Sequence, residues 1–348
     1  MPGKSGSFDC IFPPAHAFFI GPGFYVRRIG VFSCSCGLDT AIGAGTHLRL
    51  VKLESQRKLW GLAFAAPSLV LFLVFTLIPV IGAGMLAFQD FQAGSGFWHS
   101  PYVGLDNFRD LFFNPVFSED FYIALENTAV ITVVLVPFNI LIALVIAGLI
   151  YPLGERSQNF FKAAFYLPGI VSAVVIAMVW QWMFTEHNGL INMTLRAMGG
   201  SGVGWFSSRW NAVWAIIISS LPYAPGAGII LYVAALGRIP PELVESADID
   251  GASVWQKWRH IVLPLLRPTT LYLVVISTIE SFKVFTPVYV MTQARPANQS
   301  TSLVYEIYQN AFGAGEFGLA AAEAMVLFVI TVIFALVQFR VLRGGEEM

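Results

Sequence analysis

Long apolar runs alternate with short polar segments along most of the chain. Four of these runs contain no acidic or basic residue: 59–89, 127–154, 163–185 and 210–237. Each exceeds the roughly 20 residues that an α-helix needs to cross a bilayer. Two further runs, 268–292 and 317–339, contain Glu280 and Lys283 in the first and Glu323 in the second. None of the six shows the period-two alternation of membrane β-strands, so the pattern predicts an all-α polytopic protein with six transmembrane helices.

Composition and charge placement add an environment and an orientation. Hydrophobic residues make up 56% of the 348 positions and charged residues only 12%, whereas a soluble domain carries about a quarter charged residues. Lys and Arg in short loops resist translocation and so mark the cytoplasmic side. With both termini in the cytoplasm, only Arg109, Arg196, Arg209 and Arg295 lie outside, and Lys283 falls within a run. We therefore predict a multi-pass membrane protein with cytoplasmic termini and no nucleic-acid partner.

Residues 1–50 differ from the rest of the chain. They contain all three cysteines, scattered Gly and Pro, and no sustained periodicity. Cys34 and Cys36 are separated by one residue, whereas a zinc hook uses two to four, and no second ligand pair follows. We expect residues 1–50 to be a disordered or misassigned extension without a metal site, with translation starting near Val51.

A charged insert at residues 240–268 separates two of the apolar runs and is cytoplasmic in the predicted topology. The prolines at 240 and 241 suit a first helical turn, where a backbone N–H is not needed. Gly251 then offers a turn. Acids gather on the first arm and bases on the second: Glu242, Glu245, Asp248 and Asp250, then Lys257 and Arg259. The insert therefore predicts a helix, a glycine turn and a second helix.

The second arm carries its own boundary signals and one apolar face. Ser253 followed by Gln256 fits a capping box, in which each side chain satisfies a backbone N–H at the start of a helix. We expect Pro264 to end this helix. An apolar stripe recurs every three residues along it: Trp255, Trp258 and Ile261. Such a stripe is typical of a helix that packs against another surface.

Motifs that would indicate catalysis lack their context. Residues 3–5, Gly-Lys-Ser, have no room for the upstream glycine of a phosphate-binding loop. Residues 313–318, GAGEFG, match a dinucleotide pattern but lead into an apolar run and follow no strand. The histidines are dispersed, and no grouping of Ser, His and acid recommends a hydrolase. We expect a chain that is not an enzyme and binds no cofactor, so that any ATP is hydrolysed by a partner.

Seven polar or aromatic residues within the apolar runs are candidates to line a translocation path: Asn139, Gln181, Tyr223, Glu280, Lys283, Phe285 and Tyr289. Ionisable groups in a span are costly and usually face a cavity or a partner. Glu280 and Lys283 share a helix face, so they either line the path or form a structural ion pair. The uncharged polar residues fit a path or hydrogen bonds between helices. The two aromatic rings suit sugar stacking or packing.

The insert also resembles a known motif. It contains Glu245-Ser246-Ala247, Asp250-Gly251-Ala252 and Ile261-Val262-Leu263-Pro264. This spacing resembles the EAA motif of the membrane subunits of binding-protein-dependent ABC importers, with Ser246 in place of an alanine and Trp258 where phenylalanine is common. Segments 102–108, 165–168 and 281–290 resemble sugar permeases of the maltose and glycerol-phosphate type, which have a MetI-like transmembrane domain. The resemblance covers about residues 59–343, although loop 293–296 lacks the usual Gly-Gly-Pro.

This resemblance implies that residues 51–348 form a six-span permease domain in a bacterial plasma (inner) membrane. With a second, homologous permease it would form the path for a carbohydrate, either a sugar or a glycerol-phosphate-like solute. Two cytoplasmic ABC ATPase subunits would bind ATP and Mg, and an extracytoplasmic solute-binding protein would deliver the solute. The loop at 240–268 would dock on the ATPase through these residues: Glu245, Ala247, Asp250, Gly251, Ala252, Trp255, Trp258, Ile261, Leu263 and Pro264.

Two other functions remain open. One is an ABC importer permease for a non-sugar solute, such as a polyamine or an anion. The other is an ion-coupled secondary transporter, which would need embedded carboxylates and often shows inverted repeats. Only Glu280 and Glu323 are candidates for such carboxylates, and the sequence shows no repeat. The sugar-type segments outside the insert favour a carbohydrate importer.

Overall fold

The computed structural model describes residues 64–91, 100–222 and 225–343. The chain divides into two units, Met1–Leu69 and Val70–Met348, and the elements discussed below lie in the second unit apart from the start of the first span. Three expectations fall outside the described residues: the extension at 1–50, the translation start near Val51, and the path candidate Tyr223.

Three helices among the described residues are long and apolar enough to cross a membrane: Phe64–Leu86, Pro115–Ile150 and Phe317–Val341. The first ends with α2 (Ile78–Leu86), the second is α4 (Pro115–Ile150), and the third is most of α15 (Phe317–Arg343). Three pairs of helices qualify only together and bend at a short break: Glu155–Ile170 with Ala173–Met183 by 86°, Gly226–Leu236 with Pro241–Ile249 by 69°, and Val254–Leu265 with Arg267–Phe282 by 66°. The described residues thus provide three spans, or six if each bent pair is one.

Prolines lie where the predicted third, fourth and fifth spans are interrupted. The predicted third span becomes three elements: α5 (Glu155–Tyr166), a 3₁₀ turn at Leu167–Ile170 and α6 (Ala173–Met183). The fourth becomes α8 (Arg209–Ser220) and α9 (Gly226–Leu236), and the fifth becomes α13 (Arg267–Phe282) and a π-helical turn at Val288–Thr292. Pro168, Pro222, Pro225 and Pro287 lie at or beside these interruptions. Proline lacks an N–H and its ring clashes with the preceding turn, which favours a break at these positions, although Pro137 lies inside the continuous helix α4.

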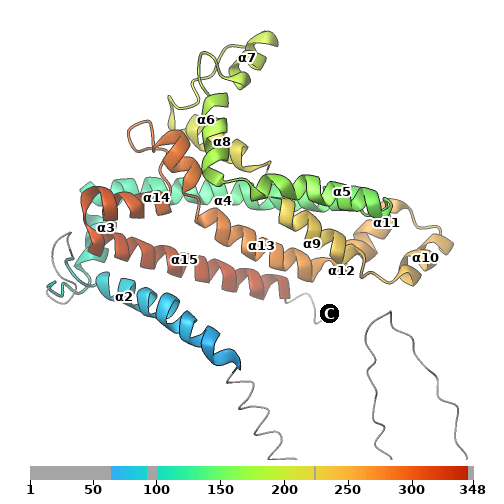
Figure 1. Ribbon diagram of the computed structural model, residues 1–348, viewed down its shortest axis with the longest axis horizontal. Coiled ribbons are helices and arrows are strands. Elements are labelled where there is room, and N and C mark those ends of the chain that lie inside the picture. The colour runs from blue at the N-terminus through green and yellow to red at the C-terminus, as the bar shows by residue number, and fades with distance from the viewer. Residues whose placement is uncertain (1–63, 92–99, 223–224, 344–348) are drawn as a thin grey trace, which may run out of the picture. The chain divides into compact units, whose positions relative to one another are not determined.

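Helix α4 makes contacts with several other helices of the second unit. Its first turn is set by Pro115 and by the Asn114 side chain, which accepts a hydrogen bond from the Val116 backbone N–H at 3.2 Å, the usual geometry of an N-cap. Helix α4 contacts α9 and α13, and α13 also contacts α15 (Figure 1). Small side chains permit this close packing, because a Cβ built on Gly228 of α9 would lie 3.1 Å from the Ala143 Cβ of α4.

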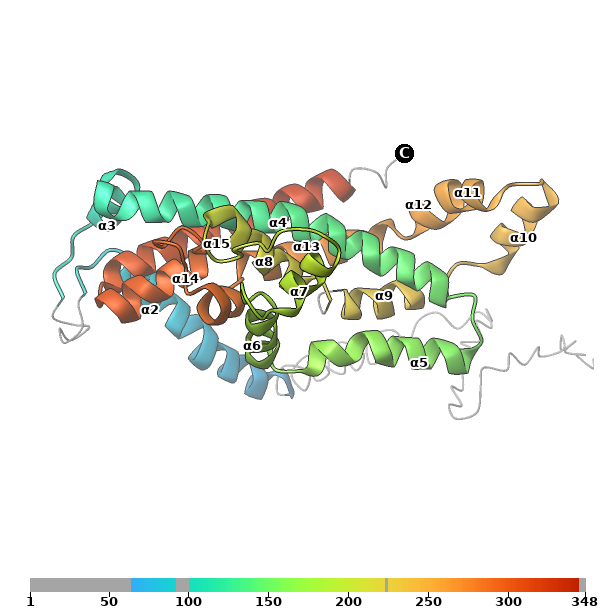
Figure 2. The ribbon, with the colours of Figure 1, turned by 90° about the horizontal axis from the view of Figure 1, so that it is seen from above.

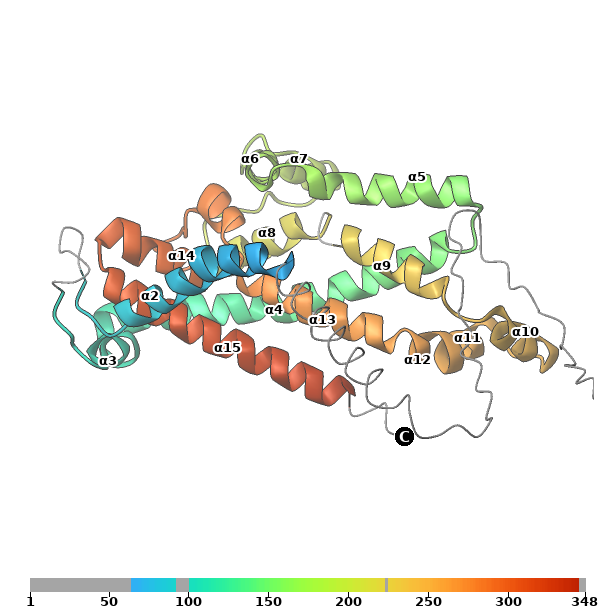
Figure 3. The ribbon, with the colours of Figure 1, turned by 60° about the horizontal axis from the view of Figure 1, so that its bottom comes forward.

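The charged insert lies at one end of α4, and α3 (Asp106–Phe113) lies at the other (Figure 2). The predicted helix, glycine turn and second helix are confirmed in the insert's four elements: α10 (Pro241–Ile249), α11 (Val254–Lys257), a π-helical turn at Trp258–Val262 and α12 (Leu263–Leu265). Helices α14 (Leu303–Tyr308) and α3 lie at the end of the bundle opposite α10 (Figure 3).

The expectation that Pro264 ends the second helix is wrong. Helical backbone continues through it, and the chain bends by 66° only where α13 begins at Arg267. The π-helical turn explains this continuation, because the Leu263 backbone N–H bonds back to the Trp258 carbonyl, five residues earlier. Pro264 then occupies the first turn of the next α-helical segment, where a missing N–H costs little.

Candidate functional site

A cavity of ≈ 390 Å³ lies among α4, α9, α13 and the start of α6. Its walls include four of the seven path candidates: Asn139, Glu280, Lys283 and Phe285. They also include four hydroxyl-bearing residues that sequence reasoning missed: Ser220, Ser277, Ser281 and Thr286. Serine and threonine often bond their own helix backbone, so their presence in an apolar run carries no signal of a cavity. Amide, charged and hydroxyl groups together suit a polar, hydroxylated solute.

Three helix interruptions meet at this cavity. Ala173 lies at the 86° bend before α6, Ser220 and Pro225 flank the interruption between α8 and α9, and Lys283 to Phe285 follow the end of α13. Irregular backbone at membrane depth is tolerated where it is buried in protein or lines a cavity. In the last interruption, the Ser302 hydroxyl donates to the Val284 carbonyl at 2.6 Å. Discontinuous helices of this kind form the binding sites of many transporters.

Asn139 of α4 lines the cavity and carries a buried polar atom without a partner. The residue is only 8% exposed, and its Oδ1 atom has no hydrogen-bond partner among the described residues. A buried polar atom left without a partner costs about 1–3 kcal/mol. Oδ1 itself has almost no accessible surface, so a ligand hydroxyl would donate to it, and recover this cost, only after the side chain rotates toward the cavity.

Glu280 and Lys283 are paired and also face the cavity. The Lys283 Nζ atom lies 3.8 Å from Glu280 Oε1, and the side chains are 61% and 70% exposed respectively. An ion pair this exposed contributes about 0–1 kcal/mol. The structure thus contains both the ion pair and the cavity-lining position that the sequence offered as alternatives. Their opposite charges leave this part of the wall neutral.

An aromatic surface adjoins the cavity through Phe285. Its ring stacks on Tyr289 with a centroid distance of 5.3 Å and an interplanar angle of 21°. Tyr308 of α14 lies 5.3 Å from Phe285 and 5.5 Å from Tyr289, and Phe312 continues the surface 5.3 Å beyond Tyr308. Sequence reasoning missed Tyr308 and Phe312, because they follow the interrupted fifth span and a loop. Stacked aromatic faces of this kind can hold the apolar face of a sugar ring.

Gln181 does not line the cavity. Its Nε2 atom donates to the Met291 carbonyl at 3.4 Å and so links α6 to the π-helical turn after α13. This long contact fits the interpretation of Gln181 as a hydrogen bond between helices.

The insert forms a second site, and its turn explains three of the predicted coupling residues. Gly251 has φ +73°, a conformation that glycine adopts at no steric cost. The Ala252 backbone N–H donates to the Ala247 carbonyl at 2.9 Å, and the Gly251 N–H donates to the Asp248 carbonyl at 3.1 Å. These two bonds form the Schellman motif, which ends a helix and satisfies its last carbonyls. The predicted coupling residues Ala247, Gly251 and Ala252 therefore fix the angle between the two arms of the insert.

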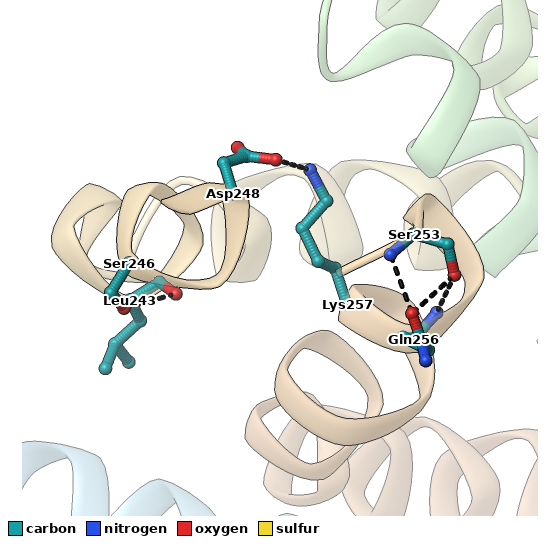
Figure 4. Close-up of polar contacts among 6 residues, drawn as sticks. All are labelled: Leu243, Ser246, Asp248, Ser253, Gln256 and Lys257. Carbon is teal, nitrogen blue, oxygen red and sulfur yellow. Dashed lines mark hydrogen bonds and ion pairs between the residues drawn. The ribbon is translucent and has the colours of Figure 1, made fainter. Parts of the chain in front are cut away.

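Side chains also join and cap the arms (Figure 4). The Lys257 Nζ atom donates to Asp248 Oδ1 at 2.6 Å across the turn. The predicted capping box is confirmed, because the Ser253 backbone N–H donates to Gln256 Oε1 at 2.7 Å and the Gln256 backbone N–H donates to Ser253 Oγ at 3.4 Å. The opposite charges of the two arms thus hold the turn together.

The predicted coupling residues lie on two different faces of the insert. Five of them are exposed and available to a partner: Glu245, Asp250, Gly251, Trp255 and Leu263. The other five are partly buried: Ala247, Ala252, Trp258, Ile261 and Pro264. The predicted stripe is therefore divided, because Trp255 is 69% exposed whereas Trp258 packs against a core cluster formed mainly by α4 and α9. Sequence reasoning missed Ile249 and Val254, which are 88% and 68% exposed beside the turn.

A hydrogen-bonded network closes the end of the bundle that faces away from the insert. Asn127 of α4 is fully buried, and its Nδ2 atom donates to the carbonyls of Gln299 and Thr301, each at 2.8 Å. Its Oδ1 atom accepts from Arg209 Nε at 3.0 Å. These bonds hold the 293–302 loop, in which four non-glycine residues have φ between 45° and 61°.

Glu306 holds the same loop from α14. Its carboxyl oxygen Oε2 accepts from Thr301 Oγ1 at 3.1 Å and from Asn298 Nδ2 at 3.3 Å. Burial raises the pKa of the Glu306 carboxyl, and the nearby Asp120 raises this pKa further. The loop where the sequence departs from the usual Gly-Gly-Pro is thus fixed by side chains from two helices.

Replacing Asn127 by Ala is expected to destabilise the protein by about 3 kcal/mol, because it leaves two loop carbonyls and the Arg209 donor without their buried partner. Thermal unfolding of the detergent-solubilised protein measures the change. The matched control is Asn211→Ala, which removes one side-chain bond, from Nδ2 to the Gly204 carbonyl, and we expect a smaller loss. Equal losses for the two variants would contradict the role of Asn127 as the centre of the network.

Comparison with known proteins adds independent observations. The chain matches the family described as binding-protein-dependent transport system inner membrane component over residues 139–344. It is 32% identical over 279 residues to the arabinooligosaccharides transport system permease protein AraP of Bacillus subtilis. The aligned region covers 80% of this chain and 86% of that protein. It is 28% identical over 298 residues to the trehalose/maltose transport system permease protein MalF of Thermococcus litoralis, with 85% and 98% covered.

A solved structure is also similar. In the crystal structure of a bacterial ABC transporter involved in the import of the acidic polysaccharide alginate, one chain matches with a TM-score of 0.71 and 26% identity, covering 85% of this chain and 99% of that chain. The predicted all-α polytopic fold is thereby confirmed. The family match includes both the cavity around Asn139 and the insert with its EAA-like spacing. On these grounds the chain belongs to the family of inner membrane components of binding-protein-dependent transport systems.

Proposed function

We propose that this chain is the transmembrane permease subunit of an ABC importer for an uncharged carbohydrate. The observation that carries this proposal is the cavity at which three interrupted helices meet, because its wall combines an amide side chain, hydroxyl groups and an adjoining aromatic surface. The insert leads through α12 directly into α13, the helix whose end lines the cavity. A movement of the insert therefore reaches the solute site through the backbone.

The charge of the cavity wall favours a neutral solute. Glu280 and Lys283 are its acid and base, and they lie close enough to offset each other. A sugar phosphate or a polyanion would need a surplus of positive charge, such as an Arg cluster. Relatives that transport arabinooligosaccharides, or trehalose and maltose, support a carbohydrate. We infer that the solute is an oligosaccharide without a charged group.

The proposed assembly contains a second, homologous permease that supplies the opposite wall of the path, two cytoplasmic ATPase subunits that bind ATP and Mg, and an extracytoplasmic solute-binding protein. A solved alginate transporter in complex with an oligosaccharide-bound periplasmic protein supports the last partner. This chain would hydrolyse nothing itself. In this proposal it lies in the bacterial inner membrane with both termini in the cytoplasm.

Glu280→Gln tests the proposed site. In the complete transporter, reconstituted with ATP on the ATPase side, we expect the rate of sugar uptake at sub-saturating sugar to fall about ten-fold, because the carboxylate can no longer accept a charge-assisted hydrogen bond of about 1.5–3 kcal/mol from a sugar hydroxyl. Labelled arabinotriose, maltose and trehalose serve as probes. The thermal unfolding temperature is expected to stay unchanged, since the ion pair is exposed.

Glu155→Gln is the matched control for this test, because Glu155 is an exposed acid in the first turn of α5 and lies outside the cavity. We expect it to leave uptake unchanged. An unaltered rate in Glu280→Gln would reject the proposed site. Uptake that needs no ATP and stops when an ionophore dissipates the ion gradients would reject the ABC importer in favour of an ion-coupled transporter.

A further inference from the structure

The indole ring of Trp258 occupies a notch on α4 that exists because residue 148 is glycine. A Cβ atom built on Gly148 would lie 2.7 Å from Cη2 and 2.9 Å from Cζ2 of Trp258. Distances below about 3 Å are shorter than van der Waals contact between carbon atoms, which have their optimum near 3.5–4.0 Å. No other side chain therefore fits at position 148 while the ring stays where it is.

The ring is held on one side and has free space on another. It packs against a core cluster that includes Ala147 of α4 and Val262 and Leu266 of the insert. It also lines a cavity of ≈ 630 Å³ between the ends of α4 and α9 and the two arms of the insert, beside Val244, Glu245 and Val254. The packed side makes the ring move with the second arm of the insert, and the open side leaves room for that arm and α4 to shift together.

Gly148 and the solute cavity are connected by continuous helix. Both Gly148 and Asn139 belong to α4, which is unbroken over 36 residues. At a rise of 1.5 Å per residue, the two positions lie about 14 Å apart along the helix axis. The backbone route from the insert reaches α13, on a different wall of the same cavity. The Trp258 contact thus supplies a second route, to α4.

We propose that Trp258, seated on Gly148, transmits movement of the insert to α4, so that Gly148 and Trp258 are positioning residues for coupled transport. This inference rests on the proposed importer function. The backbone route acts on α4 only indirectly, through the packing of α4 against α13, whereas the Trp258 contact joins the insert to α4 itself. Its loss would uncouple ATP hydrolysis from transport without preventing either assembly or basal hydrolysis.

The test uses the complete transporter and measures sugar molecules taken up per ATP hydrolysed, with maltose and arabinotriose as probes. For Gly148→Val we expect assembly with both ATPase subunits and near-normal basal hydrolysis, but at least about a five-fold lower ratio, the lower end of typical coupling between sites. Gly148→Ala and Trp258→Phe are each expected to lower the ratio less. Their combination is expected to restore it, because the alanine methyl fills space that the shorter phenyl ring vacates.

Gly154→Ala is the matched control, since nothing lies within 4 Å of a Cβ at this position, and we expect an unchanged ratio. If Gly148→Val and Trp258→Phe couple normally, or if the double variant is no better than the single ones, the transmission role is overturned while the importer function stands. If the wild-type complex takes up none of the tested sugars in an ATP-dependent way, the proposed function is rejected, and the transmission role is rejected with it.

Discussion

Replacing Gly251 by Val is expected to lower ATP-dependent sugar uptake at least about ten-fold while the protein still inserts into the membrane. The left-handed conformation of this residue costs an L-amino acid about 1–2 kcal/mol, and more for a β-branched side chain. Relief of that strain would break the two Schellman bonds and swing α11 away from α10. The exposed residues Ile249 and Val254 would then no longer present one surface to an ATPase. Uptake by the reconstituted transporter and co-purification of the ATPase subunits measure the effect.

Gly251→Asn is the control for this substitution. Nothing lies within 4 Å of a Cβ at position 251, so the added atoms meet no obstacle and only the backbone conformation matters. Asparagine tolerates the left-handed region better than other non-glycine residues, and we expect it to keep most of the uptake. Equal activity of the Val and Asn variants would show that the turn geometry does not matter for coupling.

Replacing Asn139 by Leu is expected to lower sugar uptake without lowering the stability of the protein. Leucine has a similar volume and removes the amide oxygen that has no partner, so the thermal unfolding temperature should stay the same or rise. Sugar uptake should fall about ten-fold, because a hydrogen bond to a sugar hydroxyl is lost and the cavity wall becomes apolar. Binding of sugar to the separate solute-binding protein should be unaffected, which locates the defect in this chain.

Thr132→Val is a matched control on the same helix. Thr132 is 8% exposed, as Asn139 is, and its hydroxyl oxygen also lacks a partner, but it does not line the cavity. We expect this variant to keep full uptake. A similar loss of uptake in both variants would mean that α4 tolerates no change in polarity, and it would remove the case for Asn139 as a solute contact.

The insert was predictable in detail because its signals are local. The capping box of Ser253 and Gln256, the turn at Gly251 and the start at Pro241 each involve residues a few positions apart, and all are present in the structure. The error at Pro264 is also local. A proline is a reliable end signal only where the backbone would otherwise need its N–H, and the preceding π-helical turn removed that need.

The position of the cavity in the fold was not predictable, although some of the residues that line it were. Asn139, Glu280 and Lys283 were conspicuous as polar groups in apolar runs. Nothing in a single sequence states that three interruptions meet at one point, because this depends on how the helices pack. The notch at Gly148 was missed for the same reason, since the packing role of a glycine in an apolar helix is visible only once the ring that contacts it is placed.

Helix α4 has a consequence for the permeability barrier of the membrane. Its 36 residues extend about 54 Å, well beyond the roughly 30 Å of the hydrocarbon core. Asn127, which fixes the 293–302 loop, and Gly148, which carries Trp258, lie about 32 Å apart along this axis. Pro137 lies between them without ending the helix, and a continuous helix that tilts about its middle moves its two ends in opposite directions. A tilt of α4 that opens the path at one end would close it at the other. The length of this single helix therefore opposes a state that is open to both sides of the membrane, through which protons and other ions would leak.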